Sequence, residues 1–246
     1  MTANFKLVIE YDGTQYHGWQ RQPTDKSIQG EIEAALYTMT RQKITIIGSG
    51  RTDSGVHALG QTGNFKCKTR ISPKEFQNGL NSLLPSDIVI RGCEYAAPEF
   101  HARFDTKSKV YRYSILNSAQ PSAIGRQYHW WLHAPLDVNA MQTATRYLPG
   151  KQDFRAFEGT GSPRASTVRH VMAAYLKCEV PHQLEFYIQA DGFLRFMVRN
   201  IIGTLVDVGR RKISPDQLTT IIESRDRNLA GATAPPQGLC LLQVNY

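Results

Sequence analysis

The sequence predicts an α+β protein in which the order strand, helix, strand, strand, helix, strand occurs twice. Segments whose apolar residues alternate with polar ones indicate strands, because successive side chains of a strand point to opposite faces. Segments whose apolar residues recur at helical spacing behind a capping residue indicate helices. The two kinds of segment follow each other in the same order along residues 1–105 and along residues 106–246, and we therefore expect two domains with these bounds.

The first domain begins with a strand at residues 5–11, where apolar and polar residues alternate. A helix follows Ser27, whose hydroxyl can cap it. The apolar stripe of this helix consists of Ile28, Ile32, Ala35, Leu36 and Met39. Residues 43–48 and 61–67 are predicted strands on either side of a glycine-rich loop.

A second helix starts at Ser72-Pro73-Lys74-Glu75, which has the pattern of a capping box with proline at the first helical position. A strand at 87–95 completes the domain. The second domain repeats this order, with predicted strands at 109–116, 168–179, 184–190 and 238–246, and helices at 138–148 behind Asp137, at 193–208 and from Ser214 onward. Such units are typical of ferredoxin-like halves with antiparallel sheets and helices on one face. The other sheet face, or a central cleft between the halves, would hold the active site.

The composition favours a polyanionic partner. The 29 Lys and Arg residues exceed the 21 Asp and Glu residues and give a formal net charge of +8, which suits nucleic acid. The 4 cysteines lie far apart and form no CxxC pair, so neither a zinc site nor a disulfide framework is indicated. No apolar stretch approaches the ~20 residues of a membrane span, and we expect a cytoplasmic protein without a metal.

The loop GSGRTDSGVHALGQ at 48–61 places Arg51 and Asp53 among the glycines Gly48, Gly50 and Gly55. Glycines allow a sharp turn or the close approach of a ligand. Side chains two residues apart in an extended stretch point the same way, so Arg51 and Asp53 can face each other. An arginine within ~4–6 Å would lower the pKa of the carboxyl by about 1–3 units and keep Asp53 ionised, as a nucleophile requires.

Other interpretations of this loop remain open. Asp53 could form an Asx turn while Arg51 makes a surface salt bridge. A phosphate-binding P-loop is excluded, because no Gly-Lys-Ser/Thr follows the glycines. The triplet Asp53-Ser54-Gly55 also occurs in aspartic proteases, in which two carboxylates share one proton, so a single copy would require a homodimer. A dimeric aspartic protease is therefore an alternative.

The strand at 107–116 carries residues that suit RNA. Lys109, Tyr111 and Tyr113 share one face of the strand, where a tyrosine can stack on a base and a lysine can meet a phosphate. The same pattern would arise if the tyrosines filled the core. Together with the net charge, it makes a non-catalytic RNA-binding module a second alternative.

The helix at 193–208 is apolar nearly all round, which predicts burial on more than one side. Its Arg195 and Arg199 would then need an acidic, carbonyl or phosphate partner. Arg210 and Arg211 follow at its C-terminal end, where they either contact phosphates or remain ordinary surface charges.

Several segments, together and in order, resemble the bacterial tRNA pseudouridine synthase A family and span most of the chain. They are YDGTQYHGWQRQ (11–22), GRTDSGVHALGQ (50–61), GLNSLLPSDI (79–88), FHARFDTKSKVYRY (100–113) and GFLRFMVRNIIGTL (192–205). The resemblance implies isomerisation of uridine to pseudouridine at positions 38, 39 and 40 of the tRNA anticodon stem-loop, without a cofactor. In this reaction the N1–C1′ bond breaks, the uracil turns, and C5 joins C1′.

The resemblance also implies roles for individual residues. Asp53 matches the nucleophilic aspartate and Arg51 the arginine that pairs with it. Tyr111 matches the tyrosine that stacks on the target base and could help to move the C5 proton, and Arg199 matches an arginine near the aspartate. Whether Asp53 attacks C1′ or C6 stays open.

The family further implies a homodimer that engages one tRNA with both subunits, with basic residues such as Lys109, Arg210 and Arg211 at the phosphates. The chain departs from the family pattern at Thr106, where a small alanine is usual, and at residues 159–169, which match no family pattern. These departures bear on loop contacts and target range rather than on the reaction.

Overall fold

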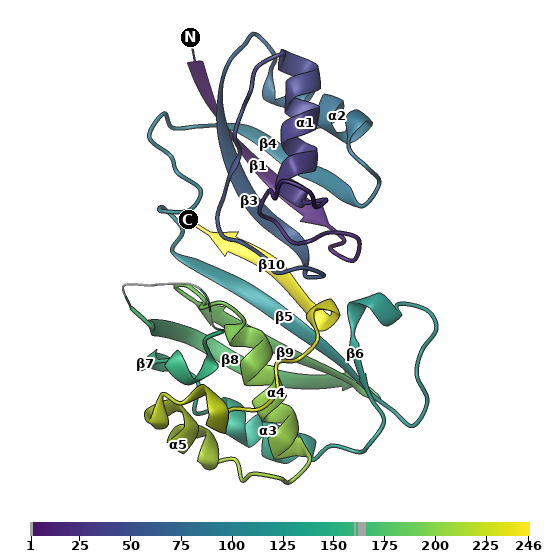
Figure 1. Cartoon of the computed structure of the whole chain (residues 1–246), viewed down its shortest axis with the longest axis vertical. Coiled ribbons are helices and arrows are strands. Elements are labelled where there is room, and N and C mark those ends of the chain that lie inside the picture. Colours follow the sequence, from purple (N-terminus) through teal and green to yellow (C-terminus); the bar gives the residue numbers. More distant parts are fainter. Residues whose placement is uncertain (1, 160, 162–165) are drawn as a thin grey trace. The chain divides into compact units, whose positions relative to one another are not determined.

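The computed structural model describes residues 2–159, 161 and 166–246, and its chain forms two compact units (Figure 1). Unit 1 comprises Met1–Lys107 together with Cys240–Tyr246, and unit 2 comprises Ser108–Leu239. The last strand was expected in the second domain, whereas Cys240–Tyr246, which include most of β10 (Leu239–Asn245), are grouped with unit 1. Within the departure at 159–169, residues 160 and 162–165 lie outside the described residues.

Unit 1 follows the predicted order of elements. These are β1 (Thr2–Tyr11), α1 (Ile28–Thr40), β2 (Ile47–Gly48), β3 (His57–Lys68), α2 (Pro73–Leu83) and β4 (Ile88–Ala96). β1 lies between β4 and β3 and is antiparallel to both, whereas β10 runs parallel to β3 through the pair Cys240 and His57. The sheet is therefore mixed, and not antiparallel throughout as expected. β2 is much shorter than the strand predicted at 43–48.

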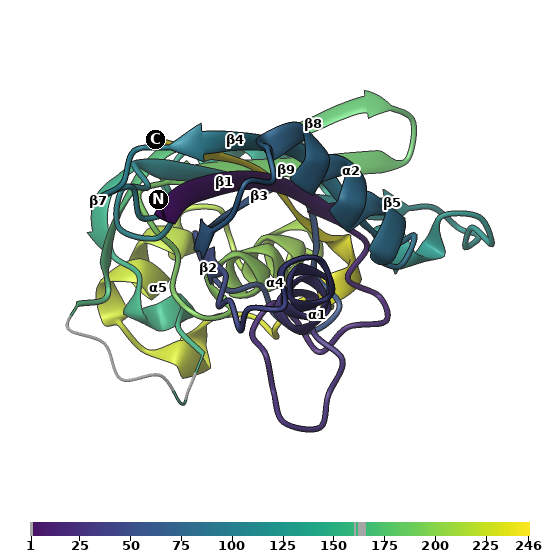
Figure 2. The same ribbon diagram turned by 90° about the horizontal axis from the view of Figure 1, so that it is seen from above.

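The core of unit 1 lies between this sheet and its helices. The alternation in β1 buries Phe5, Leu7 and Ile9, as the sequence predicts. The Phe5 ring packs 5.2 Å from the ring of Phe65 on β3 and 4.7 Å from that of Phe76 on α2. Seen from above, α1 lies on one side of β1 and β3 (Figure 2). Both predicted caps form, at Ser27 for α1 and as a capping box at Ser72 for α2.

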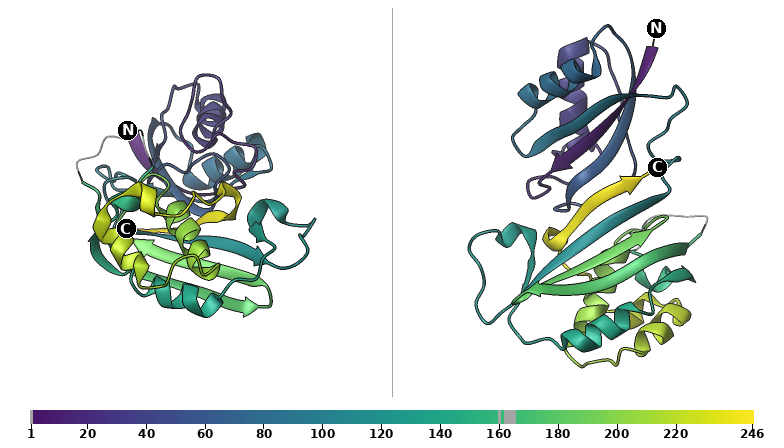
Figure 3. Two further views of the ribbon diagram at one scale, coloured as in Figure 1. Left: turned by 60° about the horizontal axis from the view of Figure 1, so that its bottom comes forward. Right: turned by 180° about the vertical axis from the view of Figure 1, so that it is seen from behind.

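In unit 2 the strands follow the order β5 (Ser108–Asn117), β9 (Gln183–Ala190), β8 (Val168–Val180) and β7 (Gly150–Asp153). These neighbours are antiparallel, and the short β6 (Trp130–Leu132) adds to β5 in parallel. β6 and β7 were not predicted. The helices are α3 (Val138–Thr145), α4 (Met197–Gly209) and α5 (Gln217–Ser224), and 3-10 turns occur at Arg126–Tyr128, Arg155–Phe157, Arg227–Leu229 and Pro236–Gly238. From behind, the strands of unit 2 lie in front of α4 (Figure 3).

Helix α4 is buried nearly all round, as its composition predicts: every residue except Arg199 and Asp207 is buried. The helix begins later than predicted, because Phe196 has a φ of 61° and lies in the left-handed region. α5 likewise begins after Ser214. The Gln217 side chain still accepts a hydrogen bond from the Ser214 backbone N–H at 2.8 Å, so one half of the predicted capping box forms.

Across the described ranges of the chain, every helix is too short or too polar to cross a membrane.

Candidate active site

Unit 1 holds Arg51 and Asp53 on the loop between β2 and β3, and a buried glutamine fixes where this loop begins. Gln61 accepts a hydrogen bond from the Ser49 hydroxyl at 2.6 Å and donates to the Gly50 carbonyl at 3.0 Å. The Ser49 backbone N–H also donates to the Thr62 carbonyl at 2.8 Å. Because Gln61 is fully buried on β3, the loop leaves the sheet in one defined direction.

The middle of the loop is anchored through Thr52. Its carbonyl accepts a hydrogen bond from the Trp19 backbone N–H at 3.1 Å, and its hydroxyl lies 2.8 Å from the Tyr11 hydroxyl. Burial raises the pKa of Tyr11 above its usual range, so this phenol stays neutral. With Thr52 buried, the residues on either side lie nearer the surface: Arg51 is exposed and Asp53 is half-buried.

A tight turn follows Asp53. The Val56 backbone N–H donates to the Asp53 carbonyl at 3.2 Å, and Gly55 has a φ of 77°. The Tyr16 carbonyl accepts from the Gly55 backbone N–H at 3.3 Å and from the Ser54 hydroxyl at 3.2 Å. The Asp53 backbone is therefore fixed on both sides, and a carboxylate held in this way suits nucleophilic or general-base chemistry.

The expected ion pair between Arg51 and Asp53 is not among the ion pairs found within the described part of unit 1. Arg51 extends into solvent, and a long exposed side chain can adopt many rotamers. Their pairing therefore stays a prediction. Packing requires a glycine at position 48, because a Cβ there would lie 2.6 Å from the Trp19 ring.

Unit 2 holds the remaining predicted residues. Tyr111 lies on β5 opposite Ile188 and is 8% exposed. Its ring makes an edge contact with Phe193 at 5.0 Å. Lys109 is half-buried on the same strand.

Tyr113, two residues further along β5, is not placed to stack on a base. It is fully buried, and its hydroxyl donates a hydrogen bond to the Pro235 carbonyl at 2.7 Å. Burial raises the pKa of this phenol. The interpretation of Tyr113 as a base-stacking side chain is therefore wrong, and the alternative that it fills the core is correct.

Arg199 is half-buried at the start of α4 and has a carbonyl partner, one of the kinds predicted. Its Nε donates to the Ala234 carbonyl at 2.7 Å, and its guanidinium lies 4.9 Å from the centre of the Phe196 ring. Arg195 lies against the same ring at 4.7 Å but is exposed, so its predicted burial was wrong. It precedes the first turn of the helix.

The two arginines that follow the C-terminal end of α4 differ in their ion pairs. Arg211 is exposed and pairs with Asp137 at 3.0 Å, which partly neutralises its charge. Asp137 also caps α3 by accepting from the Ala140 backbone N–H, and both contacts hold the pKa of this carboxyl below its usual value. Arg210 is exposed as well, and no ion pair involving it is found in the described ranges. Arg210 is therefore the better candidate for a phosphate contact.

Sequence reasoning missed the residues that hold the loop, namely Tyr11, Trp19, Thr52 and Gln61. Each lies in a segment that carries the family resemblance, but each was given no role. The available signal was the pair Gly18-Trp19, since a glycine beside a large aromatic residue often marks a close backbone approach. No group of His, Cys, Asp and Glu with the arrangement of a metal site occurs among the residues that the structure describes.

We predict that Gly18→Ala damages the site. Gly18 has a φ of 92°, and a Cβ there would lie 2.6 Å from the Thr52 carbonyl oxygen. The backbone at Thr52 and Asp53 must move to make room, and a displacement of about 1 Å in a catalytic group can lower the rate about a hundredfold. We expect a fall of that size in kcat/KM. Gly125→Ala is the control, because Gly125 has a φ of 73° with no atom within 4 Å of the added Cβ. Equal losses in both variants would contradict the steric explanation.

Comparison with known proteins gives consistent matches. A family model described as tRNA pseudouridine synthase matches residues 7–105 and 144–246. The protein named tRNA pseudouridine synthase A 2 from Clostridium perfringens (strain 13 / Type A) is 46% identical over 243 residues, which cover 99% of each chain. tRNA pseudouridine synthase A of Clostridium acetobutylicum matches equally well, at 46% identity and 99% coverage of each chain. The protein of the same name from Moorella thermoacetica is 45% identical over 98% of each chain.

Proposed function

The chain belongs to the tRNA pseudouridine synthase A family and is an isomerase that acts on tRNA, and from this premise we propose that it converts uridines 38, 39 and 40 of the anticodon stem-loop. The observation that carries the proposal is the coincidence of family membership with a half-buried aspartate on a backbone fixed from both sides. The enzyme needs no cofactor in this proposal, works as a homodimer and acts in the cytoplasm.

Asp53 is the proposed nucleophile. Its carboxylate adds to C1′ of the ribose or to C6 of the uracil, and the N1–C1′ bond breaks. The detached uracil turns and its C5 attacks C1′. If Asp53 is bound to C1′, this attack displaces the carboxylate and C5 then loses its proton; if Asp53 is bound to C6, loss of the C5 proton expels the carboxylate from C6. N1 takes up a proton in place of its bond to C1′. Atoms and electrons balance without an oxidant or reductant, since the product is an isomer of the substrate.

The other site residues support this chemistry in the proposal. Arg51 pairs with the Asp53 carboxylate when bound RNA excludes water, because an ion pair strengthens as the local dielectric constant falls. Tyr111 stacks on the target base and recovers part of the cost of removing it from the helix. Arg199 lies near the reacting aspartate in the complex.

Basic side chains hold the RNA backbone in this proposal. Lys109, Arg210 and Arg211 meet phosphates, and the net charge of +8 supports a polyanionic substrate. The affinity for tRNA should therefore fall steeply as salt is added, because each phosphate contact releases counterions.

The test is tritium release from unmodified tRNA labelled at C5 of uridine. C5 loses its hydrogen only when it joins C1′, so each turnover should release one tritium. Pseudouridine should appear at positions 38 to 40, and transcripts with cytidine at those positions should release none. Binding of tRNA without any tritium release would overturn the proposal in favour of a non-catalytic RNA-binding module. Cleavage of peptides at acidic pH would instead support the protease alternative.

A further inference from the structure

A short turn in unit 1 presents an aromatic ring to solvent on a rigid support. The turn spans residues 101–105 between β4 and β5. The His101 carbonyl accepts hydrogen bonds from the backbone N–H groups of Phe104 and Asp105, each at 3.1 Å. The Asp105 carboxylate accepts from the His101 backbone N–H at 2.9 Å, and His101 Nδ1 accepts from the Arg103 N–H at 3.2 Å. The turn therefore holds its shape through its own contacts.

The turn is also tied to the sheet. The backbone N–H of the fully buried Ala102 donates to Asn64 Oδ1 at 2.9 Å. The Asn64 amide nitrogen in turn donates to the Phe100 carbonyl at 3.2 Å and to Asn4 Oδ1 at 3.0 Å. Asn4 on β1 and Asn64 on β3 are diagonal neighbours on adjacent strands, since Asn4 lies opposite Lys66 and Asn64 opposite Lys6. The backbone that carries Phe104 is thus fixed before any partner arrives.

Phe104 is 73% exposed, more than any other aromatic side chain in the described part of the chain. One face of its ring stacks on the His101 ring with centroids 4.2 Å apart and planes 27° from parallel. The Arg103 guanidinium lies 5.6 Å from the centre of the ring. A flat ring supported on one side and accompanied by an arginine matches how proteins hold unpaired bases in RNA.

We propose that this turn is an RNA-stacking platform, in which Phe104 stacks on an unpaired base of the bound tRNA and Arg103 meets a neighbouring phosphate. The inference rests on the proposed function, because that function supplies a tRNA whose loops contain unpaired bases. The arginine favours RNA over an apolar protein partner. The ordered turn favours binding as well, since little conformational freedom is lost when the ring is covered.

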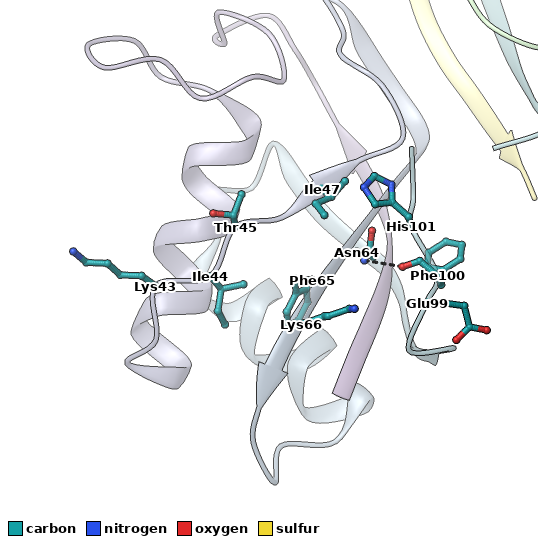
Figure 4. Close-up of a pocket in the computed structure, with 10 residues that line it drawn as sticks. All are labelled: Lys43, Ile44, Thr45, Ile47, Asn64, Phe65, Lys66, Glu99, Phe100 and His101. Carbon is teal, nitrogen blue, oxygen red and sulfur yellow. Dashed lines mark hydrogen bonds between the residues drawn. The ribbon is translucent and has the colours of Figure 1, made fainter. Parts of the chain in front are cut away.

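A hollow next to the turn does not take part in the proposal. It has a volume of about 330 Å³, and His101 is one of its lining residues (Figure 4). Lys66 points toward Phe100 and Glu99, whereas Lys43 points away. An ammonium and a carboxylate in one hollow do not select for a phosphate. The RNA contact is therefore assigned to the exposed ring and to Arg103.

The test compares Phe104→Ala and Phe104→Trp in the full-length enzyme, using unmodified tRNA. Loss of one stacking contact should raise the Kd for tRNA, and KM with it, by about 5- to 100-fold, while kcat at saturating tRNA changes less than about twofold. Phe104→Trp keeps an aromatic face and should restore binding. Arg103→Gln should reduce the slope of log Kd against log salt concentration by about one. Tyr37→Ala is the control, since Tyr37 is an aromatic residue on α1 that is 47% exposed.

The possible outcomes separate this inference from the proposed function. Wild-type binding by Phe104→Ala, in an enzyme that releases tritium normally, overturns the platform and leaves the function intact. A change in oligomeric state in Phe104→Ala, measured by light scattering, also overturns it, because the ring would then serve a protein interface. Absence of tritium release in the wild type would contradict the function, whereas the binding measurement would still decide whether Phe104 contacts RNA.

Discussion

Asp53→Ala is expected to abolish tritium release from C5-labelled tRNA, with kcat lowered at least about a thousandfold. Removing a covalent nucleophile eliminates the reaction path rather than weakening one contact along it. Asp53→Asn should behave in the same way, because the neutral amide keeps the size of the side chain but is a poor nucleophile. Folding should be preserved, since the hydrogen bonds that fix the loop near residue 53 come from backbone groups and from Thr52 and Ser54.

Binding separates this explanation from simple misfolding. Both variants should bind tRNA with a Kd close to that of the wild type, and removal of one negative charge from a protein of net charge +8 would if anything tighten it. Glu223→Gln is a charge-matched control, because Glu223 is an exposed acid on α5 in unit 2. It should retain full activity. Tritium release by Asp53→Ala at more than about a tenth of the wild-type rate would rule out Asp53 as the nucleophile.

The elements of this fold with strong local signals were predictable from the sequence. The alternation in β1 and the capping box of α2 need no information from elsewhere in the chain, and both appear where the sequence places them. The partner of β10 was not predictable. A strand pattern shows which face is buried, but nothing in Leu239–Asn245 identifies β3 as the neighbour. Long-range pairing depends on the whole topology, so the placement of the last strand could not be derived from its own sequence.

The same limit explains what was missed around the site. The pattern of the β5 segment places Tyr111 and Tyr113 on one face, yet a shared face does not reveal which residue is covered completely. Tyr113 lies against Pro235, more than a hundred residues away in the chain, and becomes a core residue. Thr52 likewise has no evident role in the sequence, where it stands between two charged residues. Its role follows only from its contacts with Tyr11 and Trp19. The proposed nucleophile, Asp53, could be selected from its motif, whereas the residues that support its loop could not.

Tyr111 should be essential for activity, and two substitutions can separate the role of its ring from that of its hydroxyl. Tyr111→Ala removes the ring that makes an edge contact with Phe193 at 5.0 Å, and with it the proposed stacking on the target base. We expect kcat/KM to fall by at least about a hundredfold, because both stacking and the position of the base are lost. Tyr111→Phe keeps the ring and removes only the hydroxyl.

The behaviour of Tyr111→Phe decides what the hydroxyl does. If it moves the C5 proton, kcat should fall by about 10² to 10⁴ while the Kd for tRNA stays unchanged, which is the loss expected for a general acid or base. A rate near that of the wild type would limit Tyr111 to stacking. Tyr113→Phe is the control on the same strand: it loses the hydrogen bond to the Pro235 carbonyl, and we expect a decrease of about 1 kcal/mol in the free energy of unfolding with kcat unaffected. Because the two tyrosines lie two residues apart on β5, opposite effects on rate and stability would assign the reaction to Tyr111 and the packing to Tyr113.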